Sequence, residues 1–265
     1  MLKFTANLSL LFTELPLLER FEAAKRHGFE AVEIQFPYEL PAEKIQAALR
    51  EHGLKLVLFN VDADTLLQGG EGLAAVPEKQ AQFKAAMAQT LEYARVLKPE
   101  VINVLPGRCL NPDHLAEYLD TFKTNLHYAA DAFADIGVTT VFEAVNSIDM
   151  PGFLIDNSAA MLAVLAELKH PHLRLQYDIY HMSRMREDCA GFLMAHSDSI
   201  GHIQFADCPG RGQPGSGEVD FDTLFDLIAT SPYDGWVGAE YKPLGDTADS
   251  LDWLKTRQAD SVAAL

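Results

Sequence analysis

The stretches of sequence that decide the fold are VTTVFEAVN (residues 138–146), LRLQYDIYH (173–181), GHIQFAD (201–207) and WVGAEYKP (236–243). Each is a short apolar run, rich in β-branched or aromatic residues, of the kind that forms a buried strand. Each apolar run stops at a residue whose side-chain oxygen can bind a metal; these residues are Glu143, Asp178, Gln204 and Glu240. An unpaired charge in an apolar setting is costly. Four such endings therefore indicate side chains that converge at one end of a parallel barrel.

The same alternation of strand and helix extends to the N-terminus. Further strand-like runs are LKFTANL (2–8), AVEIQF (31–36), LKLVLFN (54–60) and VINVLP (101–106). Helix-like stretches lie at 15–27, 42–52, 77–97, 112–133, 158–168 and 221–229, and another is expected after Thr247. Strands that alternate with helices and are apolar on both faces predict an α/β protein, a single (β/α)8 TIM-barrel domain over residues 1–265.

An open, doubly wound sheet is the alternative to the barrel. Such a sheet usually carries a glycine-rich turn after its first strand. Here that strand is followed by NLSLLFTEL (residues 7–15), which contains no glycine. No linker, charge block or low-complexity segment divides the chain either, so a closed barrel in one domain is the prediction.

Composition excludes several classes of function. The chain of 265 residues has 21 basic and 38 acidic residues and a net charge of −17. Nucleic-acid binding depends on clustered Lys and Arg that neutralise phosphates, so it is not expected. No apolar run reaches the roughly 18 residues of a membrane span. The N-terminal MLKFTANLSLLF lacks a basic leader and a cleavage site, and is interpreted as a first strand.

The cysteines indicate a reducing compartment. Cys109, Cys189 and Cys208 show no CxxC spacing and are odd in number. A disulfide framework or a structural zinc site is therefore not expected, and reduced thiols in the cytoplasm are the simpler interpretation.

The four strand-end side chains predict a metal site. Strand C-terminal ends form the active face of a TIM barrel. Three carboxylates and one amide carbonyl suit a hard divalent cation, magnesium or manganese. For any one of the four, solvent exposure or capping of the next helix is an equal alternative. All four together favour a shared site.

Basic groups near these strand ends are candidates for binding substrate. His181 lies three residues beyond Asp178, and its alternative role is packing against neighbouring tyrosines. Arg211 lies in the loop DCPGRGQPGSGEVDF (207–221), where a guanidinium suits bidentate capture of a substrate carboxylate. Lys242, two residues past Glu240, is a second such candidate.

Polar and aromatic side chains also follow the strands of the first half, where they could line a pocket for a small polar ligand. These candidates are Asn7, Phe36, Asn60 and Glu71. Lining is the expectation for them, and nothing local indicates catalysis.

At this point a resemblance is apparent. The strings FTANLSLLFTELPLLERF, FPY, VFEAVNSIDMPGF, QYDIYHMSRM, GRGQPGSGEVDFDTLF and GWVGAEYKP resemble the hydroxypyruvate isomerase family, in the same order and over nearly the whole chain. This family lies within the xylose-isomerase-like superfamily of barrels. The related 2-oxo-tetronate isomerases share much of the pattern, and SIDMPGF is more similar to the hydroxypyruvate branch.

The resemblance implies a reaction and a site. It implies isomerisation of hydroxypyruvate to tartronate semialdehyde through an enediolate, as part of glyoxylate and carbohydrate metabolism. It implies metal ligands at Glu143, Asp178, Gln204 and Glu240, with Glu143 and Glu240 as the acid/base pair. Many superfamily relatives have a histidine where this chain has Gln204, whose harder carbonyl favours magnesium over zinc. A homo-oligomer is compatible with this interpretation.

Other functions remain open on the same barrel. A ketose 3-epimerase or an inosose-type dehydratase would begin with the same enediolate. A metal-dependent endonuclease would need more histidines at strand ends and a basic face, and neither is visible. A sugar-acid binding protein without catalysis is the non-enzyme alternative.

Overall fold

Eight parallel strands close into a barrel in the computed structural model, which describes residues 2–263. Each strand pairs with the next along the chain, and the first also pairs with the last. The strands are β1 (Lys3–Asn7), β2 (Ala31–Glu33), β3 (Lys55–Asn60), β4 (Val101–Asn103), β5 (Thr139–Glu143), β6 (Leu173–Asp178), β7 (Ile200–Phe205) and β8 (Trp236–Ala239). The predicted closed barrel is therefore confirmed, and the open sheet is excluded.

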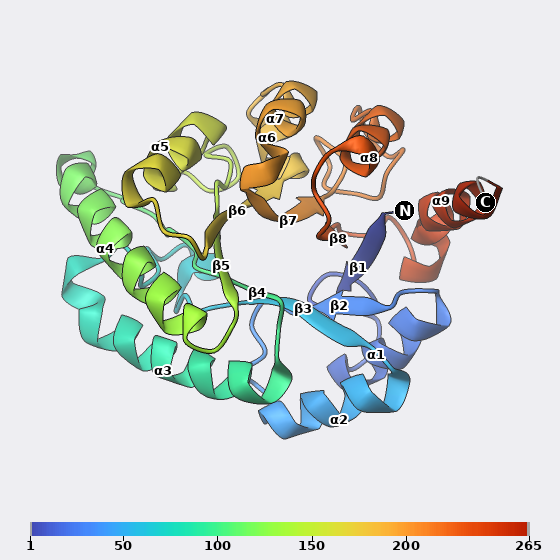
Figure 1. Ribbon diagram of the computed structural model, residues 1–265, viewed down its shortest axis with the longest axis horizontal. Helices are drawn as coiled ribbons and strands as arrows, with labels where there is room; N and C mark the ends of the chain where they lie inside the picture. The colour runs from blue at the N-terminus through green and yellow to red at the C-terminus, as the bar shows by residue number, and fades with distance from the viewer. Residues whose placement is uncertain (1, 264–265) are drawn as a thin grey trace.

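Helices surround the strands (Figure 1). They are α1 (Leu17–Arg26), α2 (Ala42–His52), α3 (Gln80–Leu97), α4 (Leu115–Ala134), α5 (Ser158–Leu168), α6 (Ile179–Arg184), α7 (Cys189–His196), α8 (Phe221–Thr230) and α9 (Asp252–Ala263). Short 3-10 turns lie at Leu66–Gln68, Pro77–Lys79, Pro112–His114, Ser197–Ser199 and Thr247–Leu251. Among the described residues, no helix has the length and hydropathy needed to cross a membrane.

Two helices, α6 and α7, were not predicted. Both are short, and α6 begins directly after a strand, where Asp178 caps it by accepting a hydrogen bond from the Tyr180 N–H. A helix of six residues gives too few turns for an apolar period to show in the sequence. The strand-end carboxylate and the start of α6 are therefore parts of the same local structure.

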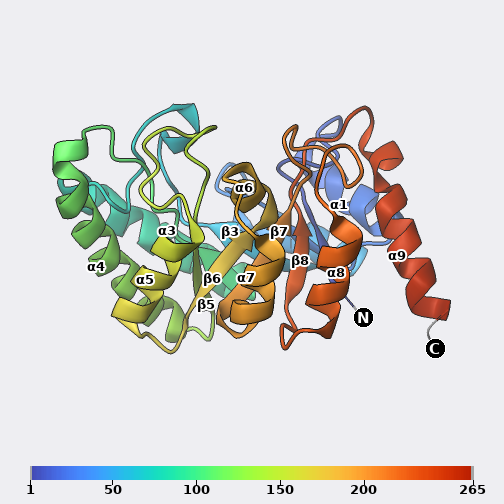
Figure 2. The same cartoon turned by 90° about the horizontal axis from the view of Figure 1, so that it is seen from above.

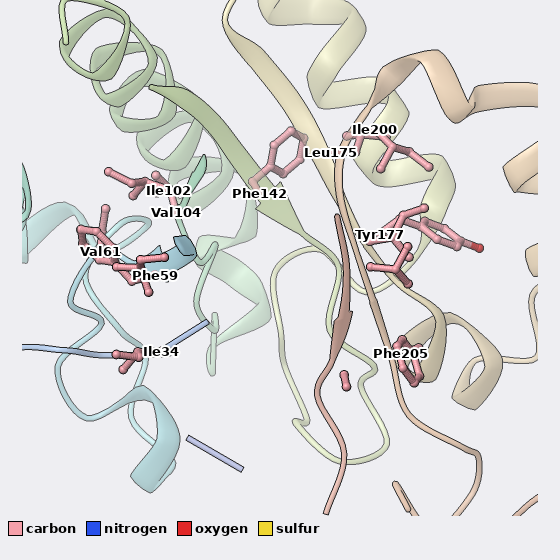
Figure 3. Packing of buried hydrophobic residues seen from close by; sticks show 14 of the residues in the cluster. Ile34, Phe59, Val61, Ile102, Val104, Phe142, Leu175, Tyr177, Ile200 and Phe205 are labelled. Carbon is pink, nitrogen blue, oxygen red and sulfur yellow. The ribbon is translucent and has the colours of Figure 1, made fainter. Parts of the chain in front are cut away.

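Alternation along each strand sends one set of side chains out to the helices and the other into the barrel. Figure 3 shows the outward set in the second half of the sheet, which includes Phe142, Tyr177 and Phe205. Tyr177 stacks on Phe192 of α7 with ring centroids 4.4 Å apart, and Phe205 meets Phe225 of α8 at 5.2 Å. Because these residues face outward, their neighbours along each strand face the barrel interior.

An apolar cluster fills the lower part of the barrel. The inward-facing residues of this cluster are Ala31, Leu58, Val101, Val141 and Trp236. On each strand, the residue two positions later is polar or a glycine and lies nearer the C-terminal end of the strand. The Trp236 indole N–H donates to Glu100 at 3.0 Å, so its polar atom is satisfied. Figure 2 shows the long loops gathered on the opposite side, around the C-terminal ends of the strands. The polar side chains therefore lie between an apolar floor and a rim of loops.

Candidate active site

The four predicted strand-end residues are all buried at the C-terminal end of the barrel. Glu143 ends β5, Asp178 ends β6, Gln204 lies on β7 and Glu240 follows β8. Their exposed fractions are 6%, 2%, 1% and 6%, respectively. Since parallel neighbouring strands end side by side, closure of the barrel brings the four sequence positions to one end of the barrel, where Gln204 lies 3.4 Å from Glu240 and Glu143 lies near Asp178.

Glu143, Asp178 and His181 form a group whose possible ligand atoms all lie within 4.8 Å of one another. The two carboxylate oxygens of Asp178 have different contacts. Oδ1 accepts the Tyr180 N–H at 2.8 Å, and buried Oδ2 has no hydrogen-bond partner among the described residues. A buried carboxylate oxygen without a partner is costly. A divalent cation would satisfy it, so the carboxylates of Glu143 and Asp178 fit a metal.

His181 is better suited to donate a hydrogen bond than to bind the cation. Its Nδ1 accepts the backbone N–H of Asn146 at 3.3 Å and lies 2.7 Å from Asn146 Nδ2. That amide is oriented in turn, because Asn146 Oδ1 accepts the Asp149 N–H at 2.8 Å. Burial, followed by the charge of Arg211, lowers the His181 pKa well below its usual value, so the ring is neutral. A neutral ring that accepts at Nδ1 carries its proton on Nε2, 3.5 Å from Asp178 Oδ2.

Glu240 accepts hydrogen bonds from several donors. Its Oε1 takes Asn7 Nδ2 and Gln35 Nε2, each at 3.0 Å, and Gln204 Nε2 at 3.4 Å. Its Oε2 pairs with Arg211 Nη2 at 2.7 Å. Burial raises the pKa of Glu240 to about 7, an effect opposed by Arg211 and reinforced by neighbouring carboxylates. Glu240 is therefore poised to gain and lose a proton near neutral pH.

Glu143 has a sparser environment. Its Oε1 accepts Asn103 Nδ2 at 2.7 Å. Burial and the nearby charges of Glu240 and Asp178 raise the pKa of Glu143 well above its usual value. Burial also raises the Asp178 pKa, while Arg211 opposes that rise. Three buried carboxylates that repel one another form an electrostatic site for a cation.

Gln204 has a fixed orientation. Its Nε2 donates to Glu33 Oε2 at 2.7 Å, and its Oε1 accepts Gln176 Nε2 at 2.7 Å. A carbonyl oxygen has two acceptor sites, so one remains for a cation. The oxygen donors of the cluster are hard, which suits magnesium or manganese.

Arg211 is held by an ordered loop between β7 and α8. The buried carboxylate of Asp207 accepts the backbone N–H groups of Cys208, Gly215, Gly217 and Val219. The Arg211 N–H donates to the Asp207 carbonyl at 2.8 Å. The guanidinium lies over the Tyr180 ring, 5.0 Å from its centroid. Its buried Nε has no acceptor among the described residues, so a donor beside Glu240 is unused.

The other predicted lining residues differ in position. Asn7 reaches Glu240, and Asn60 Oδ1 accepts Asn103 Nδ2 at 3.1 Å. Glu71 Oε1 instead accepts the Tyr118 hydroxyl at 3.1 Å and the Leu110 N–H at 3.4 Å, so these bonds join its loop to α4 and to the loop that precedes α4. Lys242 is exposed, and its backbone N–H donates to the Arg211 carbonyl. Phe36 packs against an apolar cluster formed by Ala63, Leu66, Val145 and Phe153.

Several residues of the site were missed in the sequence: Glu33, Gln35, Asn103, Asn146 and Gln176. A signal existed for four of them, because they are polar residues inside apolar runs: Glu33 and Gln35 in AVEIQF, Asn103 in VINVLP and Gln176 in LRLQYDIYH. Alternation along a half-exposed strand explains such residues equally well. Only the closed barrel shows that they face inward.

Comparisons with known proteins agree with this geometry. Residues 21–257 match the family described as Xylose isomerase-like TIM barrel. The chain is 38% identical over 254 residues to hydroxypyruvate isomerase of Escherichia coli (strain K12), an alignment that covers 96% of this chain and 98% of that protein. It is 39% identical over 253 residues to 2-oxo-tetronate isomerase of Cupriavidus necator, covering 96% and 97%.

A solved structure is also similar over its full length. The crystal structure described as AP endonuclease, family 2, from Brucella melitensis has a TM-score of 0.93 and 34% identity, covering 97% of this chain and 99% of that chain. Our chain therefore belongs to the xylose isomerase-like TIM barrels. Within them it belongs to the hydroxypyruvate and 2-oxo-tetronate isomerases and is an isomerase of the aldose–ketose type.

Proposed function

We propose that this enzyme interconverts hydroxypyruvate and 2-hydroxy-3-oxopropanoate (tartronate semialdehyde) by proton transfer through an enediolate. The proposal includes a divalent cation, magnesium or alternatively manganese, held by Glu143, Asp178, Gln204 and Glu240. It also includes a cytoplasmic role in glyoxylate and carbohydrate metabolism. The relatives named for this reaction support the substrate, and the oxygen donors of the cluster support the cation.

The observation that carries the proposal is the unused donor of Arg211. Its Nη2 is bonded to Glu240 while its buried Nε has no acceptor among the described residues. A carboxylate of the substrate can satisfy this donor in a charge-assisted hydrogen bond. Neutral sugars lack that group, so a short hydroxy-keto acid fits this site better than a ketose does.

The two glutamates are suited to move the proton. A proton leaves the hydroxyl-bearing C3 of hydroxypyruvate and returns at C2, while the C3 hydroxyl proton is transferred to the C2 oxygen; each transfer at carbon needs a carboxylate within reach. Glu143 and Glu240 lie three strands apart on the barrel, so they could flank a bound substrate. Glu143 is anchored through Oε1 by Asn103, which leaves Oε2 for the proton. This division lets one glutamate both hold its position and act as acid or base.

His181 and the cation would stabilise the charge that develops on oxygen. The Nε2–H of neutral His181 is a donor for a substrate oxygen. A bound divalent cation would supply Lewis-acid stabilisation of the enediolate oxygens. Arg211 would hold the carboxylate end, so the reacting carbons would lie between the glutamates.

Proton NMR in heavy water with the Mg²⁺-loaded enzyme tests this function. Hydroxypyruvate should gain deuterium and yield a tartronate semialdehyde signal, and both should be lost in Glu143→Gln and in Glu240→Gln. Unchanged hydroxypyruvate, or activity that survives in both variants, would refute the proposal.

A second candidate is isomerisation of a 2-oxo-tetronate, favoured by the 39% identical relative of that name. The two substrates share the carboxylate and the keto group and differ by one carbon. The same NMR assay with 2-oxo-tetronate separates them: a larger kcat/KM for the four-carbon acid would move the assignment to this reaction.

A further inference from the structure

Glu33, at the end of β2, is a wholly buried carboxylate outside the proposed chemistry. Its oxygens accept from three side chains on other strands. Oε1 lies 2.7 Å from His202 Nε2, and Oε2 lies 2.7 Å from Gln204 Nε2 and 3.3 Å from Asn7 Nδ2. Gly238 on β8 leaves room for it, because a Cβ there would lie only 2.0 Å from Glu33 Oε1. Residues of three other strands therefore contact Glu33 or leave space for its side chain.

A carboxylate decides which way a neighbouring amide faces. Ionised carboxylate oxygens accept hydrogen bonds and donate none. Gln204 must therefore turn its Nε2 to Glu33, and its Oε1 turns away toward Gln176 Nε2. A flipped Gln204 amide would place two acceptors against each other at Glu33 and two donors against each other at Gln176. Glu33 thus fixes the direction of the one neutral ligand proposed for the cation.

The same carboxylate reaches the second glutamate through Asn7. Asn7 Nδ2 lies 3.3 Å from Glu33 Oε2 and 3.0 Å from Glu240 Oε1. His202, fully buried on β7, holds the other Glu33 oxygen. Glu33 therefore orients one predicted ligand directly, Gln204, and a second one, Glu240, through Asn7.

We propose that Glu33 is a positioning residue: held by His202, it fixes the Gln204 carbonyl and the Asn7 amide and so sets the affinity for the cation. This inference rests on the proposed function, since it takes Gln204 as an oxygen ligand. Groups that orient metal ligands typically change metal affinity about 10- to 100-fold when they are replaced.

Titration of the metal-free protein with Mn²⁺, followed by electron paramagnetic resonance, tests the inference without an activity assay. Glu33→Gln should weaken Mn²⁺ binding about 10- to 100-fold, because its amide can present either a donor or an acceptor to Gln204. The matched control is Glu30→Gln, which removes the same charge at an exposed site just before the same strand. It should bind Mn²⁺ as the wild type does.

A double-mutant cycle separates positioning from general support of the fold. If Glu33 acts through Gln204, then Glu33→Gln should cost much less affinity in a Gln204→Leu background than alone. A purely structural role predicts losses that add. If Glu33→Gln does not fold, Glu33→Asp keeps a carboxylate but shortens it by one methylene, and the same cycle applies.

The outcomes are distinct. Additive losses, or wild-type Mn²⁺ affinity in a folded Glu33 variant, would overturn the positioning role and leave the proposed function intact. A wild-type protein that binds no Mn²⁺, or one whose Mn²⁺ affinity is unchanged by Asp178→Asn, would overturn both.

Discussion

The two halves of the barrel use different chemistry at their strand ends. Strands β5–β8 end in or near Glu143, Asp178, Gln204 and Glu240, so this half carries the predicted ligands and proton carriers. Strands β1, β3 and β4 end in the amides Asn7, Asn60 and Asn103. At each of the two boundaries between the halves, an asparagine of the first half donates to a glutamate of the second. The first half thus supplies neutral donors that hold the two predicted proton carriers of the second, Glu143 and Glu240.

The two boundaries differ in the number of side chains that donate a hydrogen bond to the glutamate. At β4/β5 Glu143 has Asn103 as its side-chain donor. At β8/β1 Glu240 has Asn7, Gln35, Gln204 and Arg211. Replacing a single donor should therefore disturb Glu143 more than Glu240. Glu33 is the exception in the first half, a carboxylate that lies among amides and faces His202.

The largest expected effect separates chemistry from support. Glu143→Gln removes a proton carrier and should lower kcat for hydroxypyruvate by about 10²- to 10⁴-fold. Asn60→Leu, in the amide half, touches only Asn103 among the strand-end groups described above and should lower kcat less than about tenfold. Steady-state kinetics with Mg²⁺ would measure both. Equal losses would remove the distinction between the halves.

The next effect concerns the boundaries. Asn103→Leu should lower kcat/KM by about 10- to 100-fold, because Glu143 loses the hydrogen bond that orients it and lowers its pKa. Asn7→Leu should cost several-fold less, since three other donors still hold Glu240. Both asparagines are buried and the replacements are similar in volume, so each variant serves as the other's control. A larger loss of kcat/KM in Asn7→Leu than in Asn103→Leu would contradict the expectation that Glu143 depends more on its single donor.

Anion binding by Arg211 gives the third effect. Arg211→Met should raise KM for hydroxypyruvate about 10- to 100-fold, the value of a lost charge-assisted hydrogen bond. Lys242→Met removes one positive charge two residues past Glu240, from an exposed side chain. It should change KM less than about threefold. A KM that responds to Lys242 and not to Arg211 would move the carboxylate-binding role to the lysine.

The smallest effect is a dependence of stability on pH. The Glu240 pKa rises from 4.5 to about 7 on folding. The folded protein therefore keeps a proton that the unfolded chain has already released. This contribution is fully present below pH 4.5 and is lost as pH rises through about 7. The unfolding temperature of the metal-free protein should fall more over this window in the wild type than in Glu240→Gln, as differential scanning calorimetry would show. Identical slopes would contradict the raised pKa.

The fold and the carboxylate half could be predicted because strand ends are visible in sequence. Apolar runs that stop at Glu143, Asp178 and Glu240 contain both the strand and the predicted metal ligand in one motif. The amide half could not be assigned in the same way, since an asparagine after a strand is common in turns and caps. Glu33 was missed because its partner His202 lies 169 positions away along the chain. Contacts of that kind appear only when the barrel closes.

His181 shows a second limit. Its position three residues after Asp178 predicts contact with substrate, but the sequence does not tell whether the ring nitrogen that faces the site donates or accepts. The Asn146 N–H at Nδ1 separates the two roles, because it leaves the ring proton on Nε2. No feature of the sequence reports which nitrogen carries the proton.

The most direct measurement is an anomalous-scattering map of a crystal of this protein soaked in Mn²⁺. The account predicts one strong peak at the mouth of the barrel, coordinated by oxygens of Glu143, Asp178, Gln204 and Glu240, with His181 Nε2 outside the coordination sphere. A peak bonded to His181 Nε2, or no peak among these carboxylates, would contradict it.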